Sequence, residues 1–387
     1  MKDKEIKKLI EKENIRQKKA VNLIASENFV SRDVLEALGS VFVNKYAEGY
    51  AGKRYYGGNE IVDKLEKLCQ KRALKLFGLH RAKSRWSVNV QPYSGSPANL
   101  AVLSALVPAG GKIMGMSLEM GGHLTHGQKV SITGKIWKQI AYGVDKKTER
   151  LNYDEILKIA KKEKPALIIA GATAYPREID FKKFRKIADA VGAYLMVDMS
   201  HIAGLVAGGE HPSPFLYADV VTTTTHKTLR GPRAALIFCK KELAQKIDRA
   251  VFPGLQGGPH MNQVAAVAVA LKEVAQPSFK KYARQVVKNA KVLANELKKR
   301  NWRIISGGTD NHLLLVDTWA RGIGGKEASE RLERAGIIVN KNAIPFDTRK
   351  PADPSGIRLG TPAVTTRGMK EKDMVKIAGR IDKILKL

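Results

Sequence analysis

Short apolar segments alternate with helical patterns through the middle of the chain, and this alternation restricts the possible fold more than any other feature. Helical patterns at 153–162 and 181–191 stand between apolar segments. Because parallel strands need helical crossovers, this order predicts an α/β fold with a mainly parallel sheet and helices on both faces. Five segments have the length and composition of buried strands: 112–116, 166–170, 193–197, 219–224 and 234–238.

The pattern changes near Gln276-Pro277-Ser278, where a long helical segment begins. A chain of 387 residues is too long for one small core, so we expect two domains. We predict an N-terminal arm and large domain over 1–276 and a smaller α/β domain over 277–387. The other expected elements are helices at 1–20, 61–77, 280–300 and 371–385, an apolar run at 312–317 and a Pro-rich loop at 345–354.

The chain is strongly basic, with 68 Lys and Arg against 37 Asp and Glu, a formal net charge of +31. Such a surface attracts polyanions, of which nucleic acid is the obvious candidate. The basic residues are spread along the chain, however, and no aromatic and basic stretch resembles an RNA-binding sheet. A solvated Lys-rich surface is therefore the favoured interpretation, and nucleic-acid binding stays as an alternative that we do not expect to be specific.

Several classes of protein are not expected. No run approaches the roughly 20 apolar residues that span a bilayer, and the first residues mix Lys with Glu, unlike a signal peptide. Cys69 and Cys239 are isolated, so neither a disulfide framework nor a CxxC metal site is available. His123 and His126 form an HxxH pair without a third ligand, so we expect no metal. These features predict a cytoplasmic protein that does not bind membranes.

Two of the predicted strands lead into residues with chemical potential. The segment 219–224 is followed by His226 and Lys227, and the segment 193–197 is followed by Asp198 and His201. Parallel sheets place their sites at the carboxyl ends of strands. A lysine and an acid placed in this way suit pyridoxal phosphate, whose aldehyde bonds to lysine and whose ring nitrogen pairs with a carboxylate. Taken alone, Lys227 is more often a surface lysine.

A phosphate site is expected where Ser94-Gly95-Ser96-Pro97 precedes a helical stretch rich in Ala and Leu. Pro97 suits the first turn of a helix, and the free N–H groups there attract phosphate. The sequence has no P-loop, and no GxGxxG follows a predicted strand. An ordinary turn with a helix cap explains these four residues equally well.

Nine longer segments span nearly the whole chain. They are NLIASENF (22–29), NKYAEGYAGKRYYGG (44–58), VNVQPYSGSPAN (88–99), GGHLTHG (121–127), VDMSHIAGLV (197–206), TTTTHKTLRGPR (222–233), FPGLQGGPH (252–260), SGGTDNH (306–312) and SGIRLGTPA (355–363). These segments resemble serine hydroxymethyltransferase, a pyridoxal-phosphate-dependent family of fold type I (aspartate aminotransferase-like). They occur in the family's order, which makes chance an inadequate explanation. The resemblance implies that the large domain binds pyridoxal phosphate.

The resemblance implies a role for each matching residue around the cofactor. Lys227 forms the Schiff base, Asp198 pairs with the ring nitrogen, His123 stacks on the ring, and His201 lies near its phenolic oxygen. Thr173 and His226 lie close by, and Arg233 supports the site. The phosphate is bound by Ser94, Gly95 and Ser96, joined across a dimer interface by Tyr46 and Gly258.

Further residues are implied for the substrates. Arg358 holds the amino acid carboxylate with its planar fork of donors, assisted by Ser26 and by Tyr56 of the neighbouring subunit. Glu48 handles the proton of the substrate hydroxyl or of the folate. The folate residues are Leu118, Gly122 and Leu124 around the pterin and aromatic ring, Asn342 on the pterin, and Tyr55 nearby.

The implied reaction is the reversible conversion of L-serine and tetrahydrofolate into glycine, 5,10-methylenetetrahydrofolate and water, a step of one-carbon metabolism. The implied assembly is a homodimer or a dimer of dimers with shared sites, acting on small-molecule substrates. One enzymatic alternative is a folate-independent aldolase acting on β-hydroxy amino acids. Dependence of serine cleavage on folate distinguishes the two.

Overall fold

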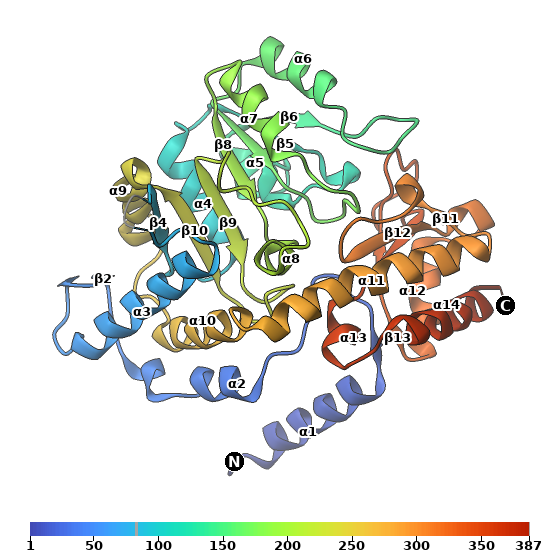
Figure 1. The fold of residues 1–387 in the computed structure, drawn as a ribbon, viewed down its shortest axis with the longest axis horizontal. Coiled ribbons are helices and arrows are strands. Elements are labelled where there is room, and N and C mark those ends of the chain that lie inside the picture. Colours follow the sequence, from blue (N-terminus) through green and yellow to red (C-terminus); the bar gives the residue numbers. More distant parts are fainter. Residues whose placement is uncertain (82–83, 387) are drawn as a thin grey trace.

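A seven-stranded sheet forms the centre of the larger part of the molecule (Figure 1). In the computed structural model, which describes residues 1–81 and 84–386, its strand order is β4-β10-β9-β8-β7-β5-β6. Strand β10 is antiparallel to both neighbours, and the remaining pairs are parallel. The predicted α/β class with a mainly parallel sheet is confirmed. The strands are β4 (Trp86–Asn89), β5 (Lys112–Met116), β6 (Lys138–Tyr142), β7 (Leu167–Ala170), β8 (Tyr194–Asp198), β9 (Val220–Thr224) and β10 (Ala235–Lys240).

The five predicted strands correspond to β5, β7, β8, β9 and β10, with ends that differ by two residues at most. Strands β4 and β6 were not predicted. They are the two edges of the sheet, and their sequences WSVN and KQIAY mix polar with apolar residues. An edge strand is less enclosed than a central one, so it lacks the continuous apolar run on which the prediction depended.

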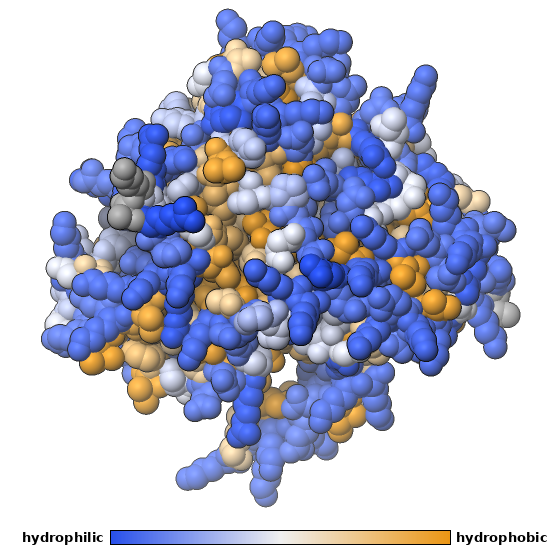
Figure 2. All heavy atoms as spheres, in the orientation of Figure 1, coloured by the Kyte–Doolittle hydropathy of each residue, from blue (hydrophilic) through white to orange (hydrophobic). Residues whose placement is uncertain are grey.

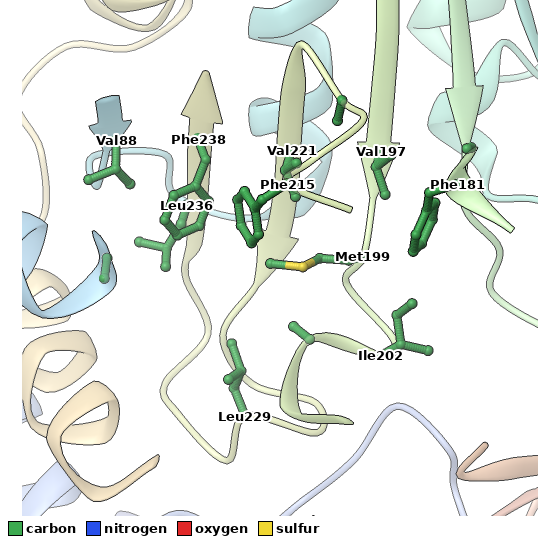
Figure 3. Packing of buried hydrophobic residues seen from close by; sticks show 14 of the residues in the cluster. Val88, Phe181, Val197, Met199, Ile202, Phe215, Val221, Leu229, Leu236 and Phe238 are labelled. Atoms are coloured by element: carbon green, nitrogen blue, oxygen red, sulfur yellow. The ribbon is translucent and has the colours of Figure 1, made fainter. Parts of the chain in front are cut away.

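Helices cover both faces of this sheet, because successive residues of a strand point to opposite faces. On β8, Leu195 and Val197 belong to one hydrophobic cluster, and Met196 belongs to another. Figure 3 shows part of the first cluster, where Phe238 and Phe215 pack edge to face with ring centroids 5.2 Å apart. The helices that contribute to this first cluster are α3 (Glu60–Leu76), α6 (Tyr153–Glu163), α7 (Phe181–Asp189), α8 (Ala203–Gly208) and α10 (Met261–Val274). The helices that contribute to the second cluster, on the opposite face of the sheet, are α4 (Gly95–Leu106), α5 (Ile132–Ile136) and α9 (Ala244–Arg249).

The C-terminal part has its own antiparallel sheet in the order β11-β12-β15-β14. Helix α11 (Pro277–Lys299) joins the two parts: Phe279 and Ala283 pack with the large sheet, whereas Leu293 and Leu297 pack with the small one. The predicted helices near 280–300 and 371–385 are confirmed. The elements are β11 (Arg303–Ile304), β12 (Leu313–Asp317), α12 (Gly325–Arg334), β13 (Ile337–Ile338), β14 (Asn340–Asn342), β15 (Gly356–Gly360), α13 (Pro362–Thr366) and α14 (Glu371–Lys386).

The N-terminal segment crosses to the C-terminal part (Figure 1). Helix α1 (Lys4–Lys19) buries none of its residues, while β1 (Val21–Asn22) pairs with β13 and Leu23 is buried in the small cluster. Helix α2 (Arg32–Leu38) then packs on α10, and β2 (Gly49–Tyr50) with β3 (Lys53–Arg54) forms a short hairpin. Among the described residues, no helix combines the length and the apolar character needed to cross a membrane.

Candidate active site

A pocket of about 320 Å³ opens at the carboxyl ends of the large sheet's parallel strands and reaches to β15 of the small sheet. This is the edge at which parallel sheets gather functional side chains. The fold brings many of the predicted site residues together here from distant parts of the chain. Those that line the pocket are Ser26, Ser94, Gly95, Ser96, His123, Thr173, Asp198, His201, His226, Lys227, Arg233 and Arg358.

Lys227 lies three residues beyond the end of β9 and is only 8% exposed. Its amine has no hydrogen-bond partner among the residues that the structure describes. Burial lowers the pKa of Lys227 to about 8; Asp198 opposes this shift, whereas Arg358 and Arg233 add to it. The uncharged form that a nucleophilic amine requires is therefore far more populated near neutral pH than it would be for a lysine in water.

Asp198 ends β8 and is held by three donors. Its Oδ2 accepts a hydrogen bond from Asn99 Nδ2 at 2.8 Å and lies 3.1 Å from His126 Nε2, while Oδ1 accepts from the Ser200 backbone N–H at 3.0 Å. Burial opposes ionisation, but the contact with His126 and the other hydrogen bonds hold the pKa of Asp198 below its usual range. The pocket therefore keeps a carboxylate rather than a carboxylic acid.

The start of α4 forms a second polar wall. Ser94 is the N-cap of this 12-residue helix, and its side chain makes no capping hydrogen bond. A Cβ at Gly95 would lie 2.6 Å from Thr224 Cγ2, so only glycine allows this approach. The Thr224 hydroxyl is buried without a hydrogen-bond partner in the described structure. The free backbone N–H groups at the start of this helix suit an anion such as phosphate.

Arg358 lies on β15, lines the same pocket and is only 6% exposed. Its Nε donates to Asn340 Oδ1 at 3.1 Å and one terminal N–H donates to the Thr173 carbonyl at 2.8 Å. Within the described part of the chain, no carboxylate forms an ion pair with it. Burial lowers its pKa to about 10, so it remains cationic at neutral pH. A buried cation of this kind favours an anionic ligand.

Two histidines add neutral rings to the pocket. His123 Nδ1 accepts from the Thr125 N–H at 3.2 Å, and burial, with His126 nearby, lowers its pKa to about 4. Burial and then the charges of Lys227 and Arg233 lower the pKa of His226 to about 3. The Nδ1 atom of His226 is buried without a partner among the described residues. Both rings are therefore uncharged at neutral pH.

Sequence reasoning missed several residues that support the site. Asn99 and His126 hold Asp198, and Asn340 holds Arg358. A signal was present for His126, because it is the second histidine of the HxxH pair, which we considered only as a metal site. No local sequence pattern indicates Asn99 or Asn340, because Asp198 and Arg358, their partners, lie 99 and 18 residues further along the chain.

The other predicted residues do not line this pocket in the single chain. Tyr46 lies with its hydroxyl 3.4 Å from Glu48 Oε1, and Gly258 lies against the Tyr46 ring beside a second cavity of about 420 Å³. Tyr55 and Tyr56 are 74% and 49% exposed. The folate residues are also outside it: Leu118 and Leu124 are exposed, Gly122 packs against the Met116 carbonyl, and the Asn342 amide donates to the Ala343 carbonyl at 2.6 Å.

The residues of the pocket fit pyridoxal phosphate. The cofactor needs an amine for its aldehyde, a carboxylate for its ring nitrogen and an anion site for its phosphate. Lys227, Asp198 and the start of α4 offer these three groups around one cavity.

Comparison with known proteins gives two findings. The family model described as serine hydroxymethyltransferase matches residues 1–381. A relative named serine hydroxymethyltransferase, from Acidobacterium capsulatum, is 56% identical over 376 residues, which cover 97% of this chain and 87% of the relative.

These findings confirm the predicted resemblance, fold type, activity and cofactors. Proteins of this family bind small-molecule substrates and act as oligomers. The chain belongs to the serine hydroxymethyltransferase family, whose members use pyridoxal phosphate to interconvert serine and glycine with tetrahydrofolate as cosubstrate.

Proposed function

We propose that the pocket around Lys227 is the site at which this chain interconverts serine and glycine. One observation carries the proposal: a buried amine with no partner among the described residues, a buried carboxylate and a buried guanidinium line a single cavity. Bound pyridoxal phosphate supplies an acceptor for the electron pair that is released when the Cα–Cβ bond of serine breaks.

The proposed cofactor residues divide into three groups. Lys227 provides the amine for the aldehyde, and Asp198 keeps the ring nitrogen protonated because its own pKa is held low. Backbone N–H groups at Ser94, Gly95 and Ser96 would bind the phosphate at the start of α4. The neutral rings of His123 and His201 line the same pocket and would stand beside the cofactor ring and its phenolic oxygen.

Arg358 is proposed to bind the substrate carboxylate, and Ser26 lies on the same pocket to assist it. Its contacts with Asn340 and the Thr173 carbonyl orient the guanidinium while leaving donors free for a carboxylate. His226 and Arg233 line the wall near Lys227. Glu48 is proposed to carry the proton of the substrate hydroxyl or of the folate.

The folate residues are proposed from the family resemblance alone. Leu118 and Leu124 offer exposed apolar side chains, as a flat aromatic ligand requires. Gly122 gives the backbone between them its close packing. Asn342 and Tyr55 complete the set, Asn342 with amide groups that suit a pterin.

We propose a homodimer whose two sites are shared, either alone or within a dimer of dimers. Tyr46, Tyr56 and Gly258 would then reach the partner's pocket, which agrees with the finding that none of the three lines the pocket of its own chain. Co-expression of Lys227→Ala with Tyr56→Phe tests this. If the sites are shared, a mixed dimer holds one doubly altered site and one intact site, and activity returns. If each chain forms its own site, both sites carry one substitution and activity stays absent.

We also propose a cellular location and a division of the chain into two domains. Cys69 and Cys239 are buried free thiols, which supports a cytoplasmic location. The division of the chain into 1–276 and 277–387 is supported by the two separate sheets, with α11 beginning at the boundary.

The proposed activity is tested by the absorbance of the cofactor-loaded protein with glycine, before and after addition of tetrahydrofolate. We expect a long-wavelength band that grows strongly with folate, and turnover that is abolished in Lys227→Ala. A cofactor band that ignores folate, together with folate-independent cleavage, would favour the aldolase alternative. Ordinary turnover by Lys227→Ala would contradict the assignment of the lysine.

A further inference from the structure

Two buried histidines with no role in the proposed reaction lie behind His201. His312 is the last residue of the segment SGGTDNH and directly precedes β12, and His211 follows α8. The exposed fractions of His201, His312 and His211 are 4%, 0% and 7%. Buried ring nitrogens need hydrogen-bond partners inside the protein.

His201 and His312 contact each other directly. The distance between His201 Nδ1 and His312 Nε2 is 3.2 Å, and the rings are inclined by only 27°. Burial, followed by the charges of Lys227 and Arg358, keeps the pKa of His201 well below its ordinary value, and burial with the same two charges lowers that of His312 to about 3. Between two neutral rings, one nitrogen donates a hydrogen and the other accepts it.

His312 and His211 share a small cavity. Both residues line this cavity of about 10 Å³, which is close to the space that one water molecule occupies. His312 Nδ1 and His211 Nε2 have no hydrogen-bond partner among the described residues. The other polar side chains on the cavity wall already have partners: Arg177 bonds Ser306 and Asp310, and Asn311 donates to the Tyr175 carbonyl. The Tyr175 hydroxyl accepts from the Leu151 N–H, and Asp198 is held by Asn99, His126 and the Ser200 N–H.

The orientation of the hydrogens follows from His211. Its Nδ1 lies 3.0 Å from the Pro212 carbonyl, which only accepts, so Nδ1 carries the hydrogen and Nε2 is bare. A water that donates to His211 Nε2 and to His312 Nδ1 uses both of its hydrogens. If His312 instead carried its hydrogen on Nδ1, it would donate to the water. The water would then donate only one hydrogen to His211, and its second hydrogen would need another acceptor.

We propose that His312 is a positioning residue that fixes His201 as a hydrogen-bond donor toward the pocket, through one buried water shared with His211. With Nδ1 bare, His312 donates from Nε2 to His201 Nδ1. His201 then carries its hydrogen on Nε2, the nitrogen that is left to face the pocket. The inference rests on the proposed place of His201 beside the phenolic oxygen of the cofactor, an acceptor that needs a donor.

Nitrogen NMR of histidine-labelled, cofactor-loaded protein reads the ring hydrogens without any measurement of activity. The chain has 8 histidines, and single substitutions assign their signals. We expect the hydrogen on Nε2 in His201 and His312 and on Nδ1 in His211. A His201 ring with its hydrogen on Nδ1 would overturn the proposal.

Substitutions at the two outer histidines test the link. His312→Phe retains a ring but removes both nitrogens, and we expect a shifted visible absorption of the bound cofactor and a loss of about tenfold in kcat with less than about twofold change in serine KM. His312→Gln keeps an amide donor and should restore the spectrum. His211→Phe should allow both hydrogen positions at His201. The control is His80→Asn, an exposed position that should change nothing.

The outcomes separate this inference from the proposed function. If His312→Phe is folded by circular dichroism and keeps the cofactor spectrum and kcat, His312 does not position His201. If His201→Asn itself leaves the cofactor spectrum unchanged, the proposed place of His201 is wrong, whatever the NMR shows for the three rings.

Discussion

At the scale of single residues, Arg358 is the clearest case of a charge that needs a ligand. It is nearly fully buried and bonds only neutral oxygens within the described structure. We expect Arg358→Ala to raise the KM for serine by thirtyfold or more, because removing one partner of a buried charge pair costs about 2 kcal/mol or more. Steady-state kinetics measures this, with Arg85→Ala as an exposed control. An unchanged serine KM would contradict the carboxylate role.

The lowered pKa of Lys227 predicts how cofactor uptake depends on pH. Only the uncharged amine attacks an aldehyde, so the uptake rate of the cofactor-free protein should rise until the pH passes about 8 and then level off. A lysine in water, with a pKa near 10.4, would let the rate rise to about pH 10. Stopped-flow absorbance across this range distinguishes the two profiles.

At the scale of elements, the β2–β3 hairpin is held by a buried ion network. Arg54 pairs with Asp63 at 2.9 Å and with Glu66, and it donates to the carbonyls of Ala47 at 2.9 Å and Gly49 at 2.8 Å. Since Ala47 and Gly49 flank Glu48, the network fixes the backbone of the proposed proton carrier.

Arg54→Ala should therefore lower the free energy of unfolding by about 3 kcal/mol, because it leaves a buried carboxylate unpaired. Urea unfolding measures the loss. Arg16→Ala breaks an exposed pair with Glu13 on α1 and should leave stability nearly unchanged. Equal stability of the two variants would show that the Arg54 network does not hold the hairpin.

The elements also show where sequence patterns succeed. Central strands such as β7, with the sequence LIIA, are apolar throughout because helices cover both faces. The prediction of the α/β core depended on these segments. The edge strands β4 and β6 and the short strand β1 have no such apolar run in the sequence. Their pairing partners, such as β13 for β1, become neighbours only when the sheets assemble.

At the scale of the whole molecule, stability should fall in mild acid. His123, His226 and His312 have folded-state pKa values of about 4, 3 and 3, below an unfolded value near 6.5. Below pH 6.5 the unfolded chain therefore binds more protons than the folded chain. As the pH falls toward 4, each histidine lowers the free energy of unfolding by about 1.4 kcal/mol per pH unit. Urea unfolding at pH 7.5, 6 and 5 measures this slope. His312→Phe should make the slope shallower, whereas His80→Asn should not.

The charge of +31 is also a property of the whole surface. Figure 2 shows hydrophilic residues over most of the visible face, interrupted by smaller hydrophobic patches. We expect RNA to bind only at low salt, because dispersed charges are screened beyond about 8 Å at 0.15 M salt. Fluorescence anisotropy across a salt series checks this. Binding that persists near physiological salt would support the nucleic-acid alternative.

The sequence by itself determined the α/β class, the family, and a lysine and an acid placed after two strands. Periodicity and strand ends are local properties, so a single chain displays them. Only the tertiary structure decided that Asn99 and His126 hold Asp198, and that His312 lies behind His201, 111 residues away. Such pairs depend on strand order and on how the small sheet meets the large one, which local pattern does not encode.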